Sequence, residues 1–136
     1  MHPGKQHDNF HFRTNEGLYD LEASVKWIGS DILVAIWGGE RPHIGAVSLA
    51  QPRPSLKNPA VTSATASVLC VVGHKEDDLA KKASKFLSAA LNTRVVVTAG
   101  IHWGDLEDEG IRRVVQNSEV LVQRIAEKMK EVSPSK

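Results

Sequence analysis

The sequence contains one cysteine and no long apolar run. Cys70 is the only thiol, which excludes a disulfide within the chain and a cysteine-based zinc cluster. It lies in an apolar stretch, so we expect a buried thiol without special reactivity. A membrane-spanning helix needs roughly 20 consecutive apolar residues, and no segment approaches that length. The opening stretch MHPGKQHDNF also lacks the apolar core of a signal peptide, so we expect a cytoplasmic protein.

Neither sign of charge is in excess. The chain has 17 basic and 16 acidic side chains, for a net charge of +1. This balance gives no indication of a protein that binds nucleic acid or a membrane surface. Apolar residues make up 41% of the chain and charged residues 24%, values typical of a globular protein.

The length of 136 residues predicts a single domain with one core. We expect a flexible polar arm over residues 1–16, a folded domain over residues 17–132 and a polar tail over residues 133–136. The arm contains His2, His7 and His11, whose spacing matches no helix or strand face.

The first half of the domain is predicted to form four strands. Residues 21–27 alternate between apolar and polar side chains, as in a half-exposed strand. Residues 32–37 (ILVAIW) form a continuous apolar run that suits a strand buried on both faces. The third and fourth strands are predicted over residues 43–49 and 62–72. Between these two lies QPRPSLKNPA, whose three prolines favour an irregular surface loop, because proline lacks the backbone donor that a sheet needs.

The second half is predicted to be mostly helical. Apolar residues recur at three- and four-residue steps over residues 79–91 and again over residues 111–129. A β-branched strand over residues 94–99 separates the two helices. The order β-β-β-β-α-β-α predicts an α+β fold, in which two amphipathic helices pack on an antiparallel sheet.

Three histidines lie at predicted strand ends or breaks, each with a glycine nearby. They occur in the motifs HIGA, GHKED and GIH, as His43, His74 and His102. Glycine at such positions lets the backbone turn sharply or approach a ligand closely. If the strands are neighbours, the three motifs meet at one end or edge of the sheet.

Several interpretations of these motifs remain open. GHKED is first of all typical of a strand end followed by a charged helix start. The three histidines with Glu76 or Asp77 would alternatively hold a zinc ion, although no standard metal-binding spacing is present. Lys75 at a helix start, with Arg41 and His43 nearby, would instead bind an anion such as phosphate.

Two tryptophans border the same motifs. Trp37 and Trp103 would either flank a flat ligand such as a flavin or serve only in packing.

Taken together, HIGAV, GHKED and TAGIH resemble the LpdD-like prenylated-flavin chaperone family. These are small D subunits associated with gallate and other hydroxyarylic acid decarboxylases. The resemblance extends over residues 27–125 and implies a fold similar to that of proteasome assembly chaperones, which tends to dimerise. It implies a non-enzymatic carrier that binds prenylated FMN (or FMN) and delivers it to a UbiD-type decarboxylase. A UbiX-type flavin prenyltransferase would make the cofactor, and we expect a homodimer.

The resemblance also implies which residues contact the cofactor. Lys75 and a helix N-terminus would hold the phosphate, while His74 and His102 would contact the ring system. The full predicted set is His43, Gly45, Gly73, His74, Lys75, Glu76, Gly100 and His102.

Two alternatives stand beside the carrier hypothesis. One is a small metal-dependent enzyme built on His43, His74 and His102. The other is an assembly chaperone with only protein partners. The carrier hypothesis itself requires neither a catalytic residue nor a bound metal.

Overall fold

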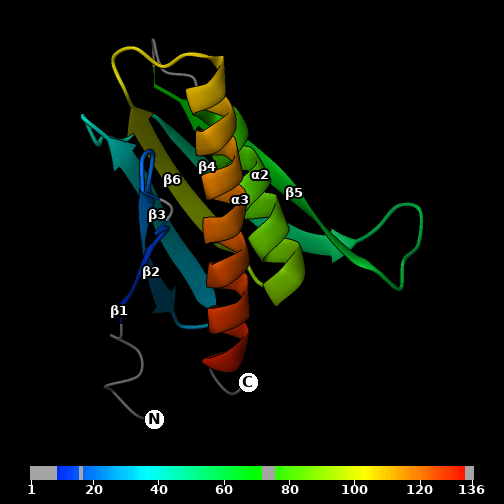
Figure 1. The fold of residues 1–136 in the computed structure, drawn as a ribbon. Coiled ribbons are helices and arrows are strands. Elements are labelled where there is room, and N and C mark those ends of the chain that lie inside the picture. The colour runs from blue at the N-terminus through cyan, green and yellow to red at the C-terminus, as the bar shows by residue number, and fades with distance from the viewer. Residues whose placement is uncertain (1–8, 16, 72–75, 134–136) are drawn as a thin grey trace.

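The computed structural model describes residues 9–15, 17–71 and 76–133. Its strands join in one sheet in the order β1-β2-β3-β6-β4-β5 (Figure 1). The strands are β1 (Asn9–Arg13), β2 (Leu21–Ile28), β3 (Asp31–Gly39), β4 (Ala46–Pro54), β5 (Thr62–Cys70) and β6 (Val95–His102). The helices are α2 (Asp77–Leu91) and α3 (Asp108–Glu131).

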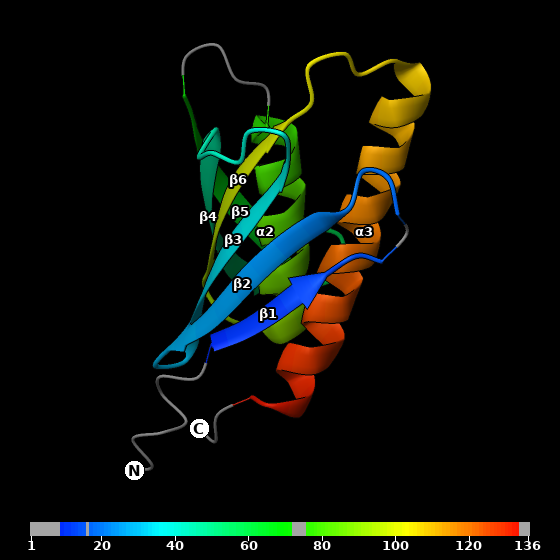
Figure 2. The ribbon, with the colours of Figure 1, turned by 60° about the vertical axis from the view of Figure 1, so that its left-hand side comes forward.

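Both helices lie on the same side of the sheet (Figure 2). Helix α2 packs on β4, β5 and β6, and α3 packs on β1 and β2. Alternate strand residues point into this layer, among them Val25, Val34 and Val97, all of which are fully buried. Because an amphipathic helix must bury its apolar stripe, the core forms between this face and the two helices. We call the opposite surface the open face, since no helix in the described part of the chain covers it.

The helix ends carry the side chains that the helix dipole favours. Asp77 and Asp78 lie in the first turn of α2, and Asp108 and Glu109 in the first turn of α3. Helix α2 ends at Leu91 and is capped by Asn92, which has a left-handed backbone (φ 51°) and donates its N–H to the carbonyl oxygen of Ser88. These local signals explain why the predicted helices appear close to their predicted bounds.

The α+β class is confirmed, but the strand order is more complex than a meander. Strands β1, β2 and β3 are successive antiparallel neighbours. Strand β6 then enters between β3 and β4, parallel to the first and antiparallel to the second. Its sequence VVVTAGIH is apolar on both faces, as a central strand requires.

The prediction of four strands before the first helix was one strand short. Strand β1 was not predicted, because NFHFR is short and mostly polar. Its Phe10 and Phe12 alternate toward the helices and pack against the core.

The strand predicted over residues 43–49 corresponds to β4 and is shifted toward the C-terminus. It begins at Ala46 and includes Pro52 and Pro54, which had been predicted to lie in a loop. Beyond Ala50, β4 has β5 as a partner but no longer pairs with β6. Proline is tolerated there because no donor is needed on that side. The hairpin that joins β4 and β5 therefore projects from the body of the molecule (Figure 1).

The prediction that Cys70 is buried was wrong, because its thiol is exposed. Cys70 is the last residue of β5, and β5 lies at the edge of the sheet, where fewer neighbours cover it.

Candidate functional site

Four of the predicted site residues meet at one end of the sheet. His43 and Gly45 lie between β3 and β4, Glu76 directly precedes α2, and Gly100 belongs to β6. The Nε2 atom of His43 lies 2.9 Å from Oε1 of Glu76. The same carboxylate oxygen accepts a hydrogen bond from the backbone N–H of Ile101 at 3.3 Å. We call these residues, with Ile101, the His43–Glu76 cluster.

The two glycines are required by close packing within this cluster. A Cβ atom on Gly100 would overlap the backbone carbonyl of His43. A Cβ on Gly45 would overlap the Glu76 carboxylate and lie 3.0 Å from Nε2 of His43. The Gly45 N–H also donates to the carbonyl oxygen of Ala99 at 2.9 Å. Gly45 and Gly100 thus hold the histidine loop directly against β6.

Both ring nitrogens of His43 face acceptors. Nδ1 lies 2.8 Å from the carbonyl oxygen of Arg41, and Nε2 faces the Glu76 carboxylate. The His43 side chain is 22% exposed, so part of the held ring remains accessible.

Glu76 is turned inward, and this changes the charge at the start of α2. Its side chain is only 12% exposed and lies against His43. Of the two acids that follow, Asp78 pairs with Lys82 at 3.0 Å, and both of these side chains are exposed. Three consecutive acids directed at one point would repel a bound phosphate. The structure turns one of them away from solvent and pairs another.

His102 lies at the same end of β6, two residues beyond Gly100, with an exposed side chain. Its carbonyl oxygen accepts from the Glu40 N–H at 2.7 Å. Gly39 (φ 88°) allows this approach, because a Cβ there would overlap the His102 carbonyl. The carboxylate of Glu40 in turn accepts from the Gly104 N–H at 2.8 Å, which ties down the loop after β6.

Gly73, His74 and Lys75 lie outside the described residues. The described residues on either side of them both contact the cluster. The Val71 N–H donates to the carbonyl oxygen of Gly45 at 2.8 Å, and Glu76 pairs with His43.

The two tryptophans have different surroundings. Trp37 lies on the open face opposite Gly100 of the neighbouring strand, and its indole N–H donates to Glu22 at 3.2 Å. Trp103 packs against the core and meets Tyr19 edge-on at a centroid distance of 5.2 Å. Packing therefore accounts for Trp103, whereas part of Trp37 is accessible.

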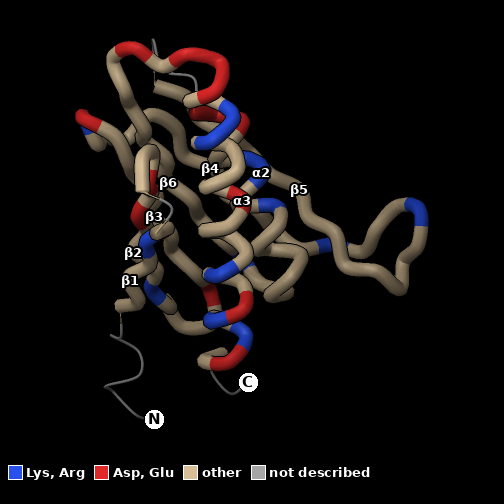
Figure 3. Tube along the Cα trace, in the orientation of Figure 1, with Lys and Arg blue, Asp and Glu red and all other residues tan. Residues whose placement is uncertain are grey.

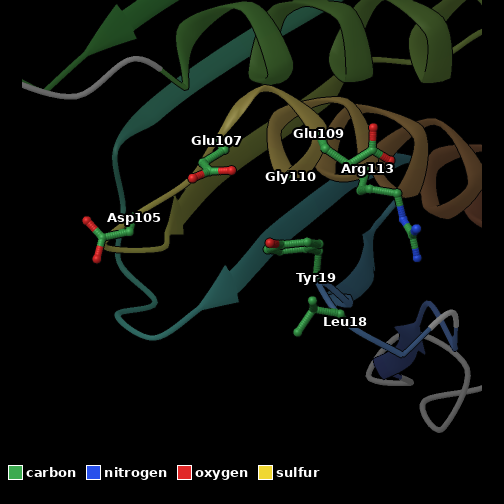
Figure 4. A pocket seen from close by; sticks show the side chains of 7 residues that line it. All are labelled: Leu18, Tyr19, Asp105, Glu107, Glu109, Gly110 and Arg113. Atoms are coloured by element: carbon green, nitrogen blue, oxygen red, sulfur yellow. The ribbon is translucent and has the colours of Figure 1, made fainter.

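A separate hollow of ≈ 330 Å³ lies beside the start of α3 (Figure 4). It is lined by Leu18, Tyr19, Asp105, Glu107, Glu109, Gly110 and Arg113. Acidic residues gather in the loop between β6 and α3, as Figure 3 shows. Three carboxylates against one guanidinium make this hollow unfavourable for a phosphate. Of the predicted site residues that the structure describes, none lines it.

Sequence reasoning missed the backbone groups that complete the cluster. The Ile101 N–H and the Arg41 carbonyl oxygen hold Glu76 and His43 in place. Every residue type carries these groups, so no sequence pattern marks them. Only the GIH motif, which includes Ile101, was a partial signal.

The described residues offer little support for the metal-site alternative. Within residues 9–15, 17–71 and 76–133, no group of three or more histidine, cysteine or acidic side chains is placed to hold a metal ion. His74, the third member of the hypothetical ligand set, lies outside these ranges. Among the same residues, no helix is long and apolar enough to cross a membrane.

Comparison with known proteins identifies relatives of the whole domain. Residues 15–130 match the prenylated flavin chaperone LpdD-like domain. Protein LpdD of Lactiplantibacillus plantarum is 28% identical over 91 residues, which make up 67% of this chain and 63% of that protein. The match thus spans less than two thirds of the length of that relative.

A solved structure shares the fold. It is a chain in the crystal structure of a novel chaperone complex for yeast 20S proteasome assembly, and it superimposes on this chain with a TM-score of 0.54. The match covers 93% of this chain and 98% of that one, at 11% identity, so the likeness concerns the fold alone. The domain match over residues 15–130 goes further: the chain belongs to the LpdD-like prenylated flavin chaperone family.

Proposed function

We propose that this protein binds prenylated FMN beside the His43–Glu76 cluster and delivers it to a UbiD-type decarboxylase. The carrier acts as a cytoplasmic homodimer and receives the cofactor from a UbiX-type flavin prenyltransferase. The observation that carries the proposal is the convergence of His43, Gly45, Glu76 and Gly100 at one end of the sheet, in a chain of this family.

The groups at this end suit a flavin. A flavin ring system is flat, apolar on its faces and rich in hydrogen-bonding atoms at its edge. The accessible part of His43, the exposed imidazole of His102 and the partly accessible Trp37 are flat side chains that contact such a ring by stacking or at its edge. Arg41, exposed beside His43, supplies a cation for the phosphate.

In this proposal the His43–Glu76 pair positions rather than reacts. Glu76 fixes the imidazole of His43 and joins three segments: the histidine loop, the start of α2 and the end of β6. A carrier gains from such a preformed site, because less ordering is required when the ligand binds. Since His43 and His102 remain accessible, the cofactor can leave by the way it entered.

The test is a titration with FMN and with freshly reduced prenylated FMN, followed by tryptophan fluorescence and absorbance. We expect saturable binding that prefers the prenylated form, weakened roughly tenfold or more by His43→Gln, which corresponds to about 1.4 kcal/mol. The control is Arg94→Gln. Arg94 pairs with Asp31 at the start of β3 and β6, at the opposite end of these strands from the cluster.

The possible outcomes separate the hypotheses. Equal affinities of the wild type, His43→Gln and Arg94→Gln would place the flavin elsewhere. No binding of either flavin by the folded wild type would reject the carrier and favour a chaperone with only protein partners. Delivery is tested by mixing the loaded carrier with an apo UbiD-type decarboxylase and measuring the gain of activity over free cofactor.

A further inference from the structure

We infer that two copies of this chain pack their open sheet faces together, centred on an apolar patch formed by Leu33, Val47, Leu49, Leu69 and Val96. The inference rests on the homodimer of the proposed function and names its interface. It does not depend on which ligand the protein binds.

The patch is continuous across four strands. Leu33 of β3 pairs with Val96 of β6, and Val96 pairs with Leu49 of β4. In the next row Val47 of β4 pairs with Leu69 of β5. Leu33, Leu49 and Leu69 are 39%, 41% and 77% exposed, although they lie in the middle or outer part of a regular sheet. Contiguous apolar surface of this kind marks an interaction site.

This half of the open face carries almost no charge. Strands β5 and β6 contain no Lys, Arg, Asp or Glu, and β4 contains none before Arg53 (Figure 3). In β3 the charged residue is Asp31, at the first position, where it pairs with Arg94 at 3.0 Å. A second copy therefore meets no like charge at the centre of the interface, whereas a strongly charged partner would find no complementary group.

The β1–β2 half of the same face differs. It presents His11, Glu22 and Lys26, and Glu22 is already engaged by His11 and Trp37. The face thus has an apolar centre beside a polar margin, which is the usual arrangement of a protein interface.

The size of the face fits a dimer. At about 4.8 Å per strand and about 3.3 Å per residue, four strands of about eight residues present roughly 500 Å², and six strands roughly 750 Å². These values are the areas of the face drawn as a plane. They are close to the roughly 800 Å² of accessible surface that each partner buries in a standard interface. A two-fold axis through the face makes each patch cover the other, with the helices outside. Two sheets packed in this way lie about 10 Å apart.

The proposed binding site adjoins this interface. Ile44 lies between His43 and Gly45, and Val71 donates to the Gly45 carbonyl oxygen. Ile44 and Val71 are 61% and 46% exposed, so the cluster has exposed apolar residues of its own beside it.

The experiment compares two substitutions of equally exposed apolar residues in the full chain. Leu49→Lys changes the open face, and Phe86→Lys changes α2 on the other side of the sheet, where Phe86 is 40% exposed. Light scattering coupled to size exclusion gives the mass. We expect the wild type and Phe86→Lys at twice the chain mass of 14.9 kDa, and Leu49→Lys at 14.9 kDa with a native circular dichroism spectrum.

A monomeric wild type, or a Leu49→Lys variant that stays dimeric, would overturn the inference. Should Leu49→Lys unfold, Leu69→Lys replaces it, because Leu69 lies on the edge strand and a charge there leaves the core intact; a folded dimer of that variant also overturns it. The flavin titration on the same samples is a separate readout. A dimer that binds no flavin contradicts the carrier alone, and a flavin-binding monomer contradicts the interface alone.

Discussion

Two histidine–glutamate pairs in this molecule share their chemistry but not their surroundings. His11 and Glu22 lie on neighbouring strands of the open face, 3.2 Å apart, with side chains 58% and 36% exposed. His43 and Glu76 lie 2.9 Å apart, with side chains 22% and 12% exposed, and they join segments distant in the sequence. Water screens the first pair, whereas the second is held by backbone groups and by glycines that leave no room for a side chain.

The comparison teaches that a histidine beside an acid forms a rigid, partly buried candidate binding site only where the surrounding backbone holds the pair. An exposed pair contributes about 0–1 kcal/mol to stability. A buried carboxylate that accepts from the Ile101 N–H and pairs with His43 costs more to disturb, because the groups left behind lose their partner away from water. The following predictions test this difference, from the largest expected effect to the smallest.

The largest effect is expected for Gly100→Ala. The added Cβ would overlap the His43 backbone, so either β6 or the histidine loop must move. Overpacking of this kind costs about 1–3 kcal/mol and occasionally more, and we expect the upper end in a urea unfolding curve. Gly104→Ala is the matched control. A Cβ there comes no closer than 3.6 Å to Glu40, so its effect should stay within about 0.5 kcal/mol.

A smaller loss is expected for Glu76→Ala. It removes the partner of His43 and of the Ile101 N–H, which predicts a loss of about 1–3 kcal/mol in the free energy of unfolding. Glu76→Gln keeps an acceptor for Ile101 and should fall between the wild type and Glu76→Ala. Glu22→Ala, at the exposed pair, should cost under about 1 kcal/mol. Equal losses at positions 76 and 22 would remove the distinction between the two pairs.

The smallest effect concerns salt. Raising the ionic strength from about 0.1 M to about 1 M shortens the Debye length from about 10 Å to about 3 Å. The ion-pair part of the stability difference between wild type and His11→Ala should then disappear, because that pair is exposed, which leaves only the ring contact of His11 with Trp37. The difference between wild type and His43→Ala should persist. If thermal unfolding showed the same salt dependence for both variants, the ion pair of His43 would be as strongly screened by salt as that of His11.

Sequence reasoning succeeded where the signal is local. The alternation in β2 and the stripes of α2 and α3 each lie within one segment, and each predicted the right element. It failed for β1, where two phenylalanines in a five-residue strand depend on the helix layer for their burial. It also failed for the end of β4, where proline is tolerated because β6 begins at Val95, opposite Ala50, and does not reach the prolines.

The candidate site divides in the same way. The motifs with His43, Gly45, Glu76 and Gly100 were recognised as three separate stretches, and the structure confirms that these four residues meet. The direction of Glu76 was not predictable, because its partners come from a loop and from a strand that are far away in the sequence. The roles of all the predicted site residues in binding remain predictions, those of His43, Gly45, Glu76 and Gly100 as much as those of Gly73, His74, Lys75 and His102.

The sequence by itself determined the α+β class, the amphipathic faces and the glycine–histidine motifs, because periodicity and residue type are properties of short segments. Only the tertiary structure decided that β6 lies between β3 and β4, that one sheet face stays open, and that His43 meets Glu76. These outcomes depend on which segments pack together, and that choice minimises the exposed apolar surface of the whole chain rather than of any one segment.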